Sequence, residues 1–264
     1  MSTFSLKLLA IITMMIDHIG AVLVSPATHP QLYFLCRAVG RLAFPIFVFL
    51  IVEGFYHTSN IKRYLKRLGI FAFVSEIPFD LAFYRFHNGA SFIKDFTEVF
   101  NDGIDMKQLA YLLERLNRYQ NVFFTLFLGL ALIYLMNLVD LKFKRSLESN
   151  LLDAGLTIAF CILAILLQTD YNFAGILLFV AFYLFRESKI LMSISLFIIC
   201  GTILSDIQAY IQTKNILHII SMLATFAMIP IAFYNGKKGK NVKYIFYIFY
   251  PAHLMIIFLI SIFI

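Results

Sequence analysis

The chain has 264 residues, of which 61% are hydrophobic and only 14% are charged. A soluble globular domain carries about 25% charged residues. These proportions therefore exclude an ordinary soluble protein and predict a single integral membrane domain over residues 1–264. The net charge of +7 would suit a nucleic-acid partner, but the basic residues lie between hydrophobic runs, so we predict no nucleic-acid partner.

Nine hydrophobic runs are candidate transmembrane spans, because about 20 residues of α-helix cross the ~30 Å hydrocarbon core of a bilayer. Short polar turns and Pro or Gly residues separate several of them. The runs fall at residues 6–25, 32–56, 68–86, 120–139, 151–168, 172–186, 190–208, 215–234 and 244–264. The predicted fold class is all-α, a polytopic transmembrane helical bundle of about nine spans.

Basic residues in the connecting segments alternate along the chain. They gather at residues 62–67, 142–145, 186–189 and 237–243, while the intervening short turns carry almost none. Because short cytoplasmic loops are enriched in Lys and Arg, we expect these four segments to face the cytoplasm. The N-terminus is then cytoplasmic, the C-terminus is outside, and the chain is a multi-pass protein of the cytoplasmic membrane.

One connecting segment, at about residues 87–118, is long enough to lie outside the membrane. From Met106 to Tyr119 it has leucines at helical spacing, which predicts an amphipathic helix on the outer face. Two other interpretations stay open. The segment is a solvated connector with a surface helix, or it is a cap that recognises a substrate.

Asp17 and His18 lie side by side within the first hydrophobic run. Ionisable residues at membrane depth are costly and are functional candidates by default. With a rise of ~1.5 Å per residue, Asp17 lies about 16 Å from the cytoplasmic end of its span, and Arg41 and His253 lie about 14 Å into theirs. Arg37 enters the same span as Arg41, so we expect four ionisable residues from three spans to meet near one plane: Asp17, Arg37, Arg41 and His253.

Helix geometry also predicts how these residues pair. Arg37 and Arg41 are four residues apart and share a helix face. Adjacent residues such as Asp17 and His18 diverge by ~100° on a helix, so we expect Asp17 to pair with an arginine and to leave His18 free toward a substrate. A buried Asp17–Arg41 ion pair without chemistry is the structural alternative.

Two prolines within predicted spans disturb the backbone hydrogen bonds. Pro45 removes the bond to the carbonyl of Arg41, which predicts a kink or break beside that guanidinium. Pro251 lies two residues before His253. A His253 that only caps a freed carbonyl is the structural alternative to a functional histidine.

The combination of imidazole, guanidinium and carboxylate groups suits acyl transfer. Histidine can take a proton from an amine or hydroxyl, and arginine can stabilise an oxyanion or hold a phosphate. The same groups suit proton-coupled transport of a small molecule. We predict no metal site, because Cys36, Cys161 and Cys200 lie within hydrophobic runs at unrelated spacings.

Seven short blocks form an ordered pattern over nearly the whole chain. They are Leu6 to Gly20, Gly40 to Phe47, Glu53 to Phe55, Ser75 to Phe79, Asn121 to Leu126, Asp170-Tyr171 and Tyr250 to Leu254. This pattern resembles the TraX family, the F-pilin acetylases and their relatives, whereas segment 87–118 does not match it. The resemblance implies a multi-pass acyltransferase that acetylates the N-terminus of a pilin subunit, with acetyl-CoA as the donor.

Carried over to this chain, the resemblance implies that His18 is the base, that Asp17 and Arg41 support it, and that His253 is a second catalytic candidate. Basic residues at the cytoplasmic mouth are expected to hold the phosphates of acetyl-CoA, the alternative being that they only orient the helices. The expected cofactor-binding residues are Arg37, Arg63, Lys66, Arg67, Lys237 and Lys238.

The expected partners are an acyl-CoA donor, the lipid bilayer and an acceptor. The acceptor itself stays open between a peptide, a glycan and a lipid-linked molecule. Two other functions also stay open. The first is a proton-coupled transporter that uses the same intramembrane cluster, and the second is an assembly subunit of a conjugation machine without chemistry of its own.

Overall fold

The structure is a computed structural model that describes residues 1–89, 91–100, 106–116, 118–144, 146–240 and 243–263. Within these residues every regular element is helical, apart from an isolated bridge between Gln120 and Thr169. The predicted all-α class is confirmed. The elements are α1 Thr3–Leu23, α2 Pro30–Gly40, α3 Ala43–His57, α4 Ile61–Asn88, α5 Phe92–Phe100, α6 Met106–Leu116, α7 Val122–Phe143, α8 Leu147–Leu166, α9 Asn172–Leu184, α10 Lys189–Ile198, a π-helix Ile199–Ile203, α11 Ile207–Thr213, a 3-10 helix Ile216–Ala227, α12 Met228–Ala232 and α13 Lys243–Ser261.

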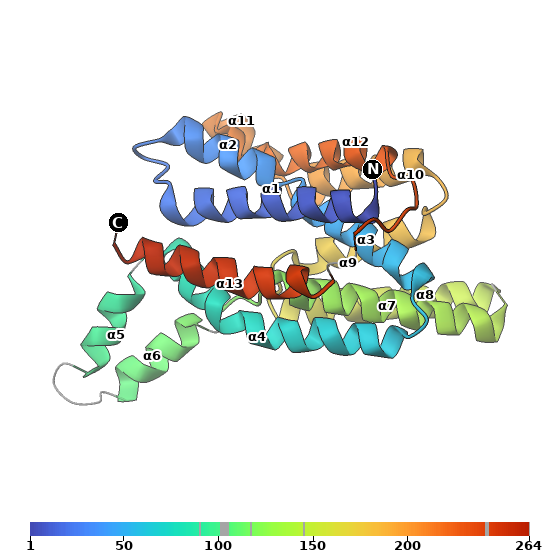
Figure 1. The fold of residues 1–264 in the computed structure, drawn as a ribbon, viewed down its shortest axis with the longest axis horizontal. Coiled ribbons are helices and arrows are strands. Elements are labelled where there is room, and N and C mark those ends of the chain that lie inside the picture. Colours follow the sequence, from blue (N-terminus) through green and yellow to red (C-terminus); the bar gives the residue numbers. More distant parts are fainter. Residues whose placement is uncertain (90, 101–105, 117, 145, 241–242, 264) are drawn as a thin grey trace.

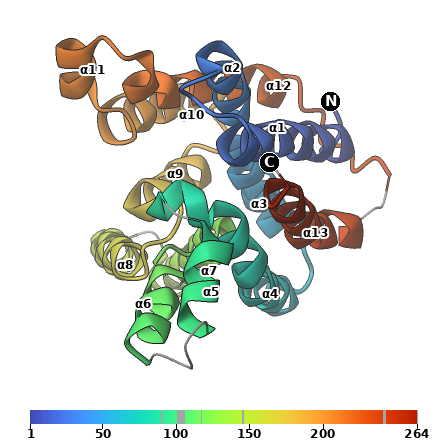
Figure 2. The ribbon, with the colours of Figure 1, turned by 90° about the vertical axis from the view of Figure 1, so that its left-hand side faces the viewer.

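The long helices lie side by side along one axis of the molecule, and α5 and α6 project from one end of them (Figure 1). We call this the hairpin end. The opposite end, which we call the basic end, carries the turns that follow α3, α7, α9 and α12 (Figure 1). Those turns contain the basic segments that the sequence predicted on one side of the membrane. In the view from the hairpin end, α1 and α4 flank α13 (Figure 2), and α13 packs on both.

Four helical segments among the described residues are long and apolar enough to cross a membrane. They are Thr3–Leu23, Pro30–His57, Val122–Phe143 and Leu147–Leu166. The pair formed by α10 with its π-helix and α11 adds a fifth if it is counted as one bent span. The chain is thus a membrane-type helical bundle, while the count of nine spans and the orientation of the termini stay predictions.

The second predicted span, 32–56, is two helices rather than one. α2 ends at Gly40 and α3 begins at Ala43, so the helix breaks at Arg41 and Leu42. Pro45 falls in the first turn of α3, where a missing N–H costs no helical hydrogen bond. The predicted break beside Arg41 is confirmed.

The seventh and eighth predicted spans are irregular. α10 passes into a π-helix, and the chain then bends by 56° into α11, so the run 190–208 is not one continuous helix. Most of the run 215–234 is a 3-10 helix, Ile216–Ala227. Hydrophobicity predicted both runs as ordinary spans because it reports composition, whereas these breaks are changes of hydrogen-bond pattern.

The segment 87–118 contains two short helices instead of one. α4 continues to Asn88 and ends where Gly89 adopts a φ of 67°, a left-handed conformation that favours glycine at a helix end. The predicted amphipathic helix is α6, which ends at Leu116. The sequence prediction missed α5, whose signal was Phe92, Phe96 and Val99 at helical spacing.

The buried core lies where α1, α3, α4, α7, α9 and α13 meet. Side chains with no exposed surface include Leu6, Ile46, Leu130 and Phe179. α8 lies at the edge and packs on α7 and α9, and its Leu147 and Leu166 are 75% and 74% exposed. A bilayer provides the apolar surroundings that such a surface needs.

Candidate functional site

Close packing of α1 on α2 brings the polar residues of the first two predicted spans together. A Cβ atom at Gly40 would lie 2.2 Å from the Asp17 carboxylate oxygen Oδ1, and one at Gly20 would lie 2.3 Å from the Cβ of Cys36. These are distances at which a larger side chain forces a rearrangement. Glycine at both positions therefore allows the Asp17 carboxylate to pass directly beside the α2 backbone.

Asp17 forms ion pairs with two arginines. Arg37 Nη1 donates to Asp17 Oδ2 over 2.8 Å, and Arg41 Nη2 donates to Oδ1 over 3.1 Å and to Oδ2 over 3.2 Å. The three side chains are 12%, 17% and 16% exposed in the order Asp17, Arg37, Arg41. The prediction that Asp17 serves an arginine is confirmed, and with two cations on one carboxylate the cluster carries a net charge of +1.

His18 contacts His253 of α13 rather than the carboxylate. Its Nδ1 lies 2.7 Å from Nε2 of His253, and the two rings are nearly parallel, with an interplanar angle of 6°. The Nδ1 of His253 lies 2.8 Å from the backbone carbonyl of Phe249, so it must donate to that oxygen. His253 thus bonds a backbone carbonyl, but that of Phe249, whereas the carbonyl whose helical hydrogen bond Pro251 removes is that of Tyr247.

These two contacts together fix the tautomers of a neutral pair, because each neutral imidazole has one donor and one acceptor nitrogen. His253 donates through Nδ1 to the Phe249 carbonyl, so its Nε2 is the acceptor. His18 must then donate through Nδ1, which leaves the lone pair on its own Nε2. An imidazole held in this way is suited to act as a base.

Aromatic rings surround the histidine pair. Phe83 of α4 meets the His18 ring edge-on at 5.2 Å, and Tyr250 lies 6.0 Å from it. The Phe249 ring stacks on His253 at 4.7 Å. Arg37 and Arg41 act on His18 through their charges, so the histidine pair and the ion cluster of Asp17, Arg37 and Arg41 form one site with two halves.

A cavity of about 390 Å³ lies next to this site at the hairpin end. Its lining residues come from α4, from the start of the α7 region and from the turn before α9: Phe79, Phe86, His87, Tyr119 and Asp170. The Phe86 ring lies 5.6 Å below the guanidinium of Arg37, and Phe83 lies 5.0 Å from Phe79 and 5.2 Å from His18. One aromatic ring thus separates the cavity wall from the histidine pair.

Asp170 is the site residue that sequence reasoning used least, since it entered only as part of a family block. Its carboxylate is exposed at the cavity and acts electrostatically on Arg41. The available signal was its place at the end of the short polar turn Gln168 to Asp170. A polar turn does not reveal which helices it faces, and here Asp170, in the turn before α9, acts on Arg41 of the ion cluster.

The predicted cofactor-binding residues divide between the two ends of the bundle. Arg37 belongs to the Asp17 cluster. The other five lie at the basic end, in the first turns of α4 or just before α13: Arg63, Lys66, Arg67, Lys237 and Lys238.

At the basic end, neither the cations of α4 nor the two lysines before α13 lie next to His18. Arg67 precedes Phe83, which touches His18, by 16 positions on α4, which is about 24 Å of helix. Lys237 and Lys238 accept backbone hydrogen bonds from Thr3 and Phe4 over 2.8 and 3.1 Å. They therefore flank the first turn of α1, far from His18 on the same helix.

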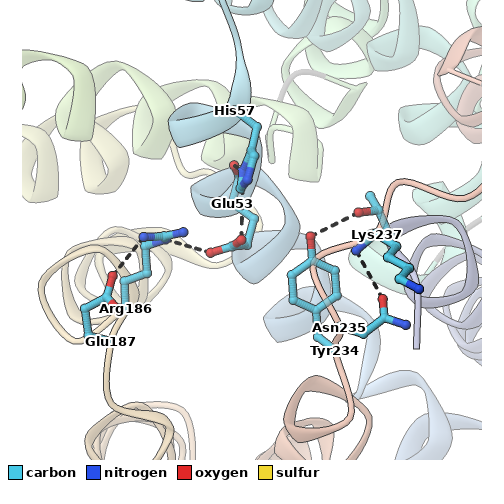
Figure 3. Close-up of polar contacts among 8 residues, drawn as sticks. Glu53, His57, Arg186, Glu187, Tyr234, Asn235 and Lys237 are labelled. Carbon is cyan, nitrogen blue, oxygen red and sulfur yellow. Dashed lines mark hydrogen bonds and ion pairs between the residues drawn. The ribbon is translucent and has the colours of Figure 1, made fainter.

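Side chains at the basic end also hold the helices to one another (Figure 3). Arg186 donates to the Glu53 carboxylate over 2.7 Å, and His57 bonds the Glu53 carbonyl over 2.8 Å. The Tyr234 hydroxyl lies 3.2 Å from the Thr3 hydroxyl of α1. Through its bond with Arg186, Glu53 links the end of α3 to the turn after α9, which is a structural role. Among the described residues no group of three or more His, Cys, Asp or Glu side chains could hold a metal ion.

The comparisons with known proteins agree on one family. The family model described as TraX protein matches residues 2–94 and 103–261, so the mismatch expected over 87–118 is confined to 95–102. A relative from Dichelobacter nodosus, the probable fimbrial assembly protein FimC of serogroup H1, is 31% identical over 245 residues, which cover 90% of this chain and 86% of the relative. No solved structure matches the chain. The chain belongs to the TraX family.

Proposed function

We propose that this protein is an integral membrane acyltransferase that moves an acetyl group from acetyl-CoA to an amine or hydroxyl acceptor. The observation that carries this proposal is the His18–His253 pair, whose hydrogen bonds leave Nε2 of His18 as a free base. The TraX family and the fimbrial assembly relative favour a pilin-like protein subunit as the acceptor.

We also propose how the chain crosses the membrane. Nine segments cross the cytoplasmic membrane, with the N-terminus inside and the C-terminus outside. The gathering of the basic turns after α3, α7, α9 and α12 at one end of the bundle supports this orientation, because Lys and Arg in short loops are retained on the cytoplasmic side.

In the proposed reaction His18 acts as the general base. Its Nε2 takes the proton from the acceptor nitrogen or oxygen as that atom attacks the acetyl carbonyl carbon. The imidazolium that forms keeps its Nδ1–H on His253, whose orientation is fixed by the Phe249 carbonyl. A positioned base of this kind contributes roughly 10²–10⁴-fold to rate.

The ion cluster supplies positive charge beside the base. Asp17 neutralises one of two guanidinium groups, so the cluster retains a net charge of +1 next to His18. Fixed positive charge in a site with little water stabilises an oxyanion strongly. Asp17 is a positioning residue in this scheme, because it holds Arg37 and Arg41 in place.

Acetyl-CoA would supply a thioester whose carbonyl carbon is the electrophile and whose thiol is the leaving group. The residues that fit its phosphates are the cations of the basic end. Arg67 fits best, since its Nε is buried and has no hydrogen-bond partner among the described residues. Arg67 lies about 24 Å of helix from the level of His18, so the group that it holds must be long and flexible, as the pantetheine arm of CoA is.

The test measures release of the free CoA thiol from acetyl-CoA by the purified protein in liposomes. The acceptor is a hydrophobic peptide with a free N-terminus, and the same peptide with a blocked N-terminus and one serine tests for a hydroxyl acceptor. We expect His18→Ala to abolish peptide-dependent release. His29→Ala is the matched control, because His29 is an exposed histidine in the turn after α1.

The pair predicts a graded series at His253. His253→Gln keeps an oxygen that can accept from His18 Nδ1 and should retain more activity than His253→Ala, with a pH profile closer to the natural protein. Full activity in His18→Ala would overturn the assignment of the base. Substrate-driven proton flux without any CoA requirement would favour the transporter instead.

A further inference from the structure

The helices α5 and α6 form a hairpin, residues 92–116, that the proposed chemistry does not use. Three residues separate α4 from α5, and five separate α6 from α7. Both ends of the hairpin are therefore tied closely to long helices of the bundle. In Figure 1 the two helices run obliquely to the bundle axis instead of continuing it.

Specific contacts hold the hairpin to the end of α4. The Tyr84 hydroxyl donates to Asp95 Oδ2 over 2.7 Å, and Arg115 Nη1 donates to the same oxygen over 2.5 Å. Tyr84, Val99 and Leu112 form a small core of their own, with 2%, 1% and 3% exposure. The hairpin is thus a folded element with a defined orientation.

The same hairpin carries a second apolar stripe that is exposed on the described part of the chain. On α5 this stripe is Ile93, Phe96 and Phe100, which are 42%, 43% and 46% exposed. They are spaced by three and four residues and share one helix face. On α6 the exposed apolar side chains Met106 and Leu113 lie seven residues apart, on one face of that helix.

A separate polar stripe on α5 points in another direction. It consists of Lys94 and Glu98, which are both exposed and whose charged atoms lie 4.0 Å apart. A short helix with an exposed apolar face beside a charged one is the pattern of helices that lie in a membrane–water interface.

In the proposed topology, in which α4 is one of the nine spans, the length of α4 places the hairpin at that interface. α4 has 28 residues, or about 42 Å of helix, which matches the ~40–45 Å of a bilayer including its headgroups. Because α4 begins at the basic end, its other end reaches the opposite headgroup layer. α5 starts three residues later, and its Phe92 contacts Phe258 of α13 at 6.0 Å between ring centroids, so the hairpin stays beside the spanning helices.

We propose that the α5–α6 hairpin lies in the lipid headgroup layer at its end of the bundle, with Ile93, Phe96 and Phe100 inserted at the acyl-chain boundary. The occupant of the exposed apolar stripe is the phospholipid surface. Phe73 and Ile77 of α4, the helix that leads into the hairpin, are 73% and 67% exposed, and a bilayer that covers such a helix favours lipid over a protein partner for the stripe as well.

The hairpin then sets the depth of the cavity beside His18. Phe86 and His87, just before the hairpin, and Tyr119, just after it, all line that cavity. A hairpin held in the headgroup layer opens the cavity at the same depth. Together with the proposed function, on which this one step rests, this means that the acceptor is presented at the membrane surface rather than from bulk water.

The natural chain contains no tryptophan, so a single introduced tryptophan reports its own surroundings. The experiment compares Phe96→Trp with Glu98→Trp on the polar stripe, in phosphatidylcholine liposomes with and without bromine atoms on the acyl chains. We expect Phe96→Trp to lose most of its emission in the brominated lipid and Glu98→Trp to keep it. Ile93→Trp and Lys94→Trp repeat the comparison with a second pair.

Equal quenching on both stripes, or quenching on neither, would overturn the proposal. A blue-shifted but unquenched Phe96→Trp whose emission depends on the protein-to-lipid ratio would instead indicate contact with a second copy.

A separate variant tests the depth of the cavity. Tyr119→Trp should be quenched most by bromine atoms placed near the headgroup end of the acyl chain, and an unquenched Tyr119→Trp would place the opening in bulk water. None of these readouts depends on acetyl transfer, so a result that refutes the hairpin proposal leaves the proposed function untouched, and the reverse also holds.

Discussion

Replacement of Asp17 by asparagine removes the counter-charge of two largely buried guanidinium groups while keeping the shape of the side chain. In the natural chain the carboxylate receives three N–H···O contacts of 2.8 to 3.2 Å from Arg37 and Arg41. Removal of one partner from a buried ion pair costs about 3–5 kcal/mol. The asparagine oxygen can still accept one of these bonds, so we expect Asp17→Asn to lower the free energy of unfolding by about 3 kcal/mol, the lower end of that range.

The matched control is Glu53→Gln at the basic end. Arg186 is 27% exposed, bonds Glu187 over 2.8 Å and lies over the Tyr56 ring at 4.3 Å, so it keeps partners and water after the change. We expect a loss of about 1 kcal/mol there, because the guanidinium left behind stays partly hydrated and keeps the Glu187 carboxylate, which brings the cost near that of exposed ion pairs. The difference of about 2 kcal/mol corresponds to roughly 30-fold in the ratio of folded to unfolded protein.

The assay is equilibrium unfolding of the purified protein in detergent micelles, with circular dichroism as the readout. The double variant Asp17→Asn/Arg41→Gln should lose less than the sum of the single losses, because residues in one ion-pair network are coupled. An Asp17→Asn variant as stable as Glu53→Gln, together with additive losses in the double variant, would refute the reasoning that this cluster needs its carboxylate.

Two further predictions concern packing and caps, with the same unfolding assay. Gly40→Ala places a Cβ 2.2 Å from the Asp17 carboxylate and should destabilise the protein by about 1–3 kcal/mol through overpacking. The control Gly155→Ala, whose Cβ meets nothing within 4 Å, should stabilise it by up to about 1 kcal/mol through helix propensity. Equal effects of the two changes would contradict the close approach of α1 and α2. Asn121 caps α7 and donates to the Ala72 carbonyl over 2.7 Å, so Asn121→Ala should cost about 2–3 kcal/mol, against about 1 kcal/mol for the exposed cap Asn60. Similar losses at the two caps would show that the link from α7 to α4 adds no stability.

The sequence predicted correctly those structural features that depend on a single property of a residue. Hydrophobic runs marked helical segments because apolar side chains must leave water wherever they finally pack. Pro45 and the guanidinium beside it marked the break after α2, because proline acts on its own backbone. The ~100° angle between neighbours on a helix predicted that Asp17 would turn to an arginine and away from His18.

The sequence could not show contacts that depend on how helices cross. His18 and His253 are 235 positions apart, and only the packing of α1 against α13 brings their rings within hydrogen-bond distance. Asp170 and the cavity residues Phe79 and Tyr119 come from three separate segments. Arg37 looked like a phosphate ligand because charge alone does not distinguish a free cation from one already paired.

By itself, then, the sequence determined a helical membrane protein with ionisable residues at depth and the helix break beside Arg41, since these follow from composition, periodicity and local backbone chemistry. Only the tertiary structure decided that two guanidinium groups share Asp17, that His253 rather than Asp17 fixes the His18 tautomer, and that an aromatic cavity adjoins them. Those features are set by distances between helices remote in the chain, which hydrophobic patterning constrains too loosely to specify.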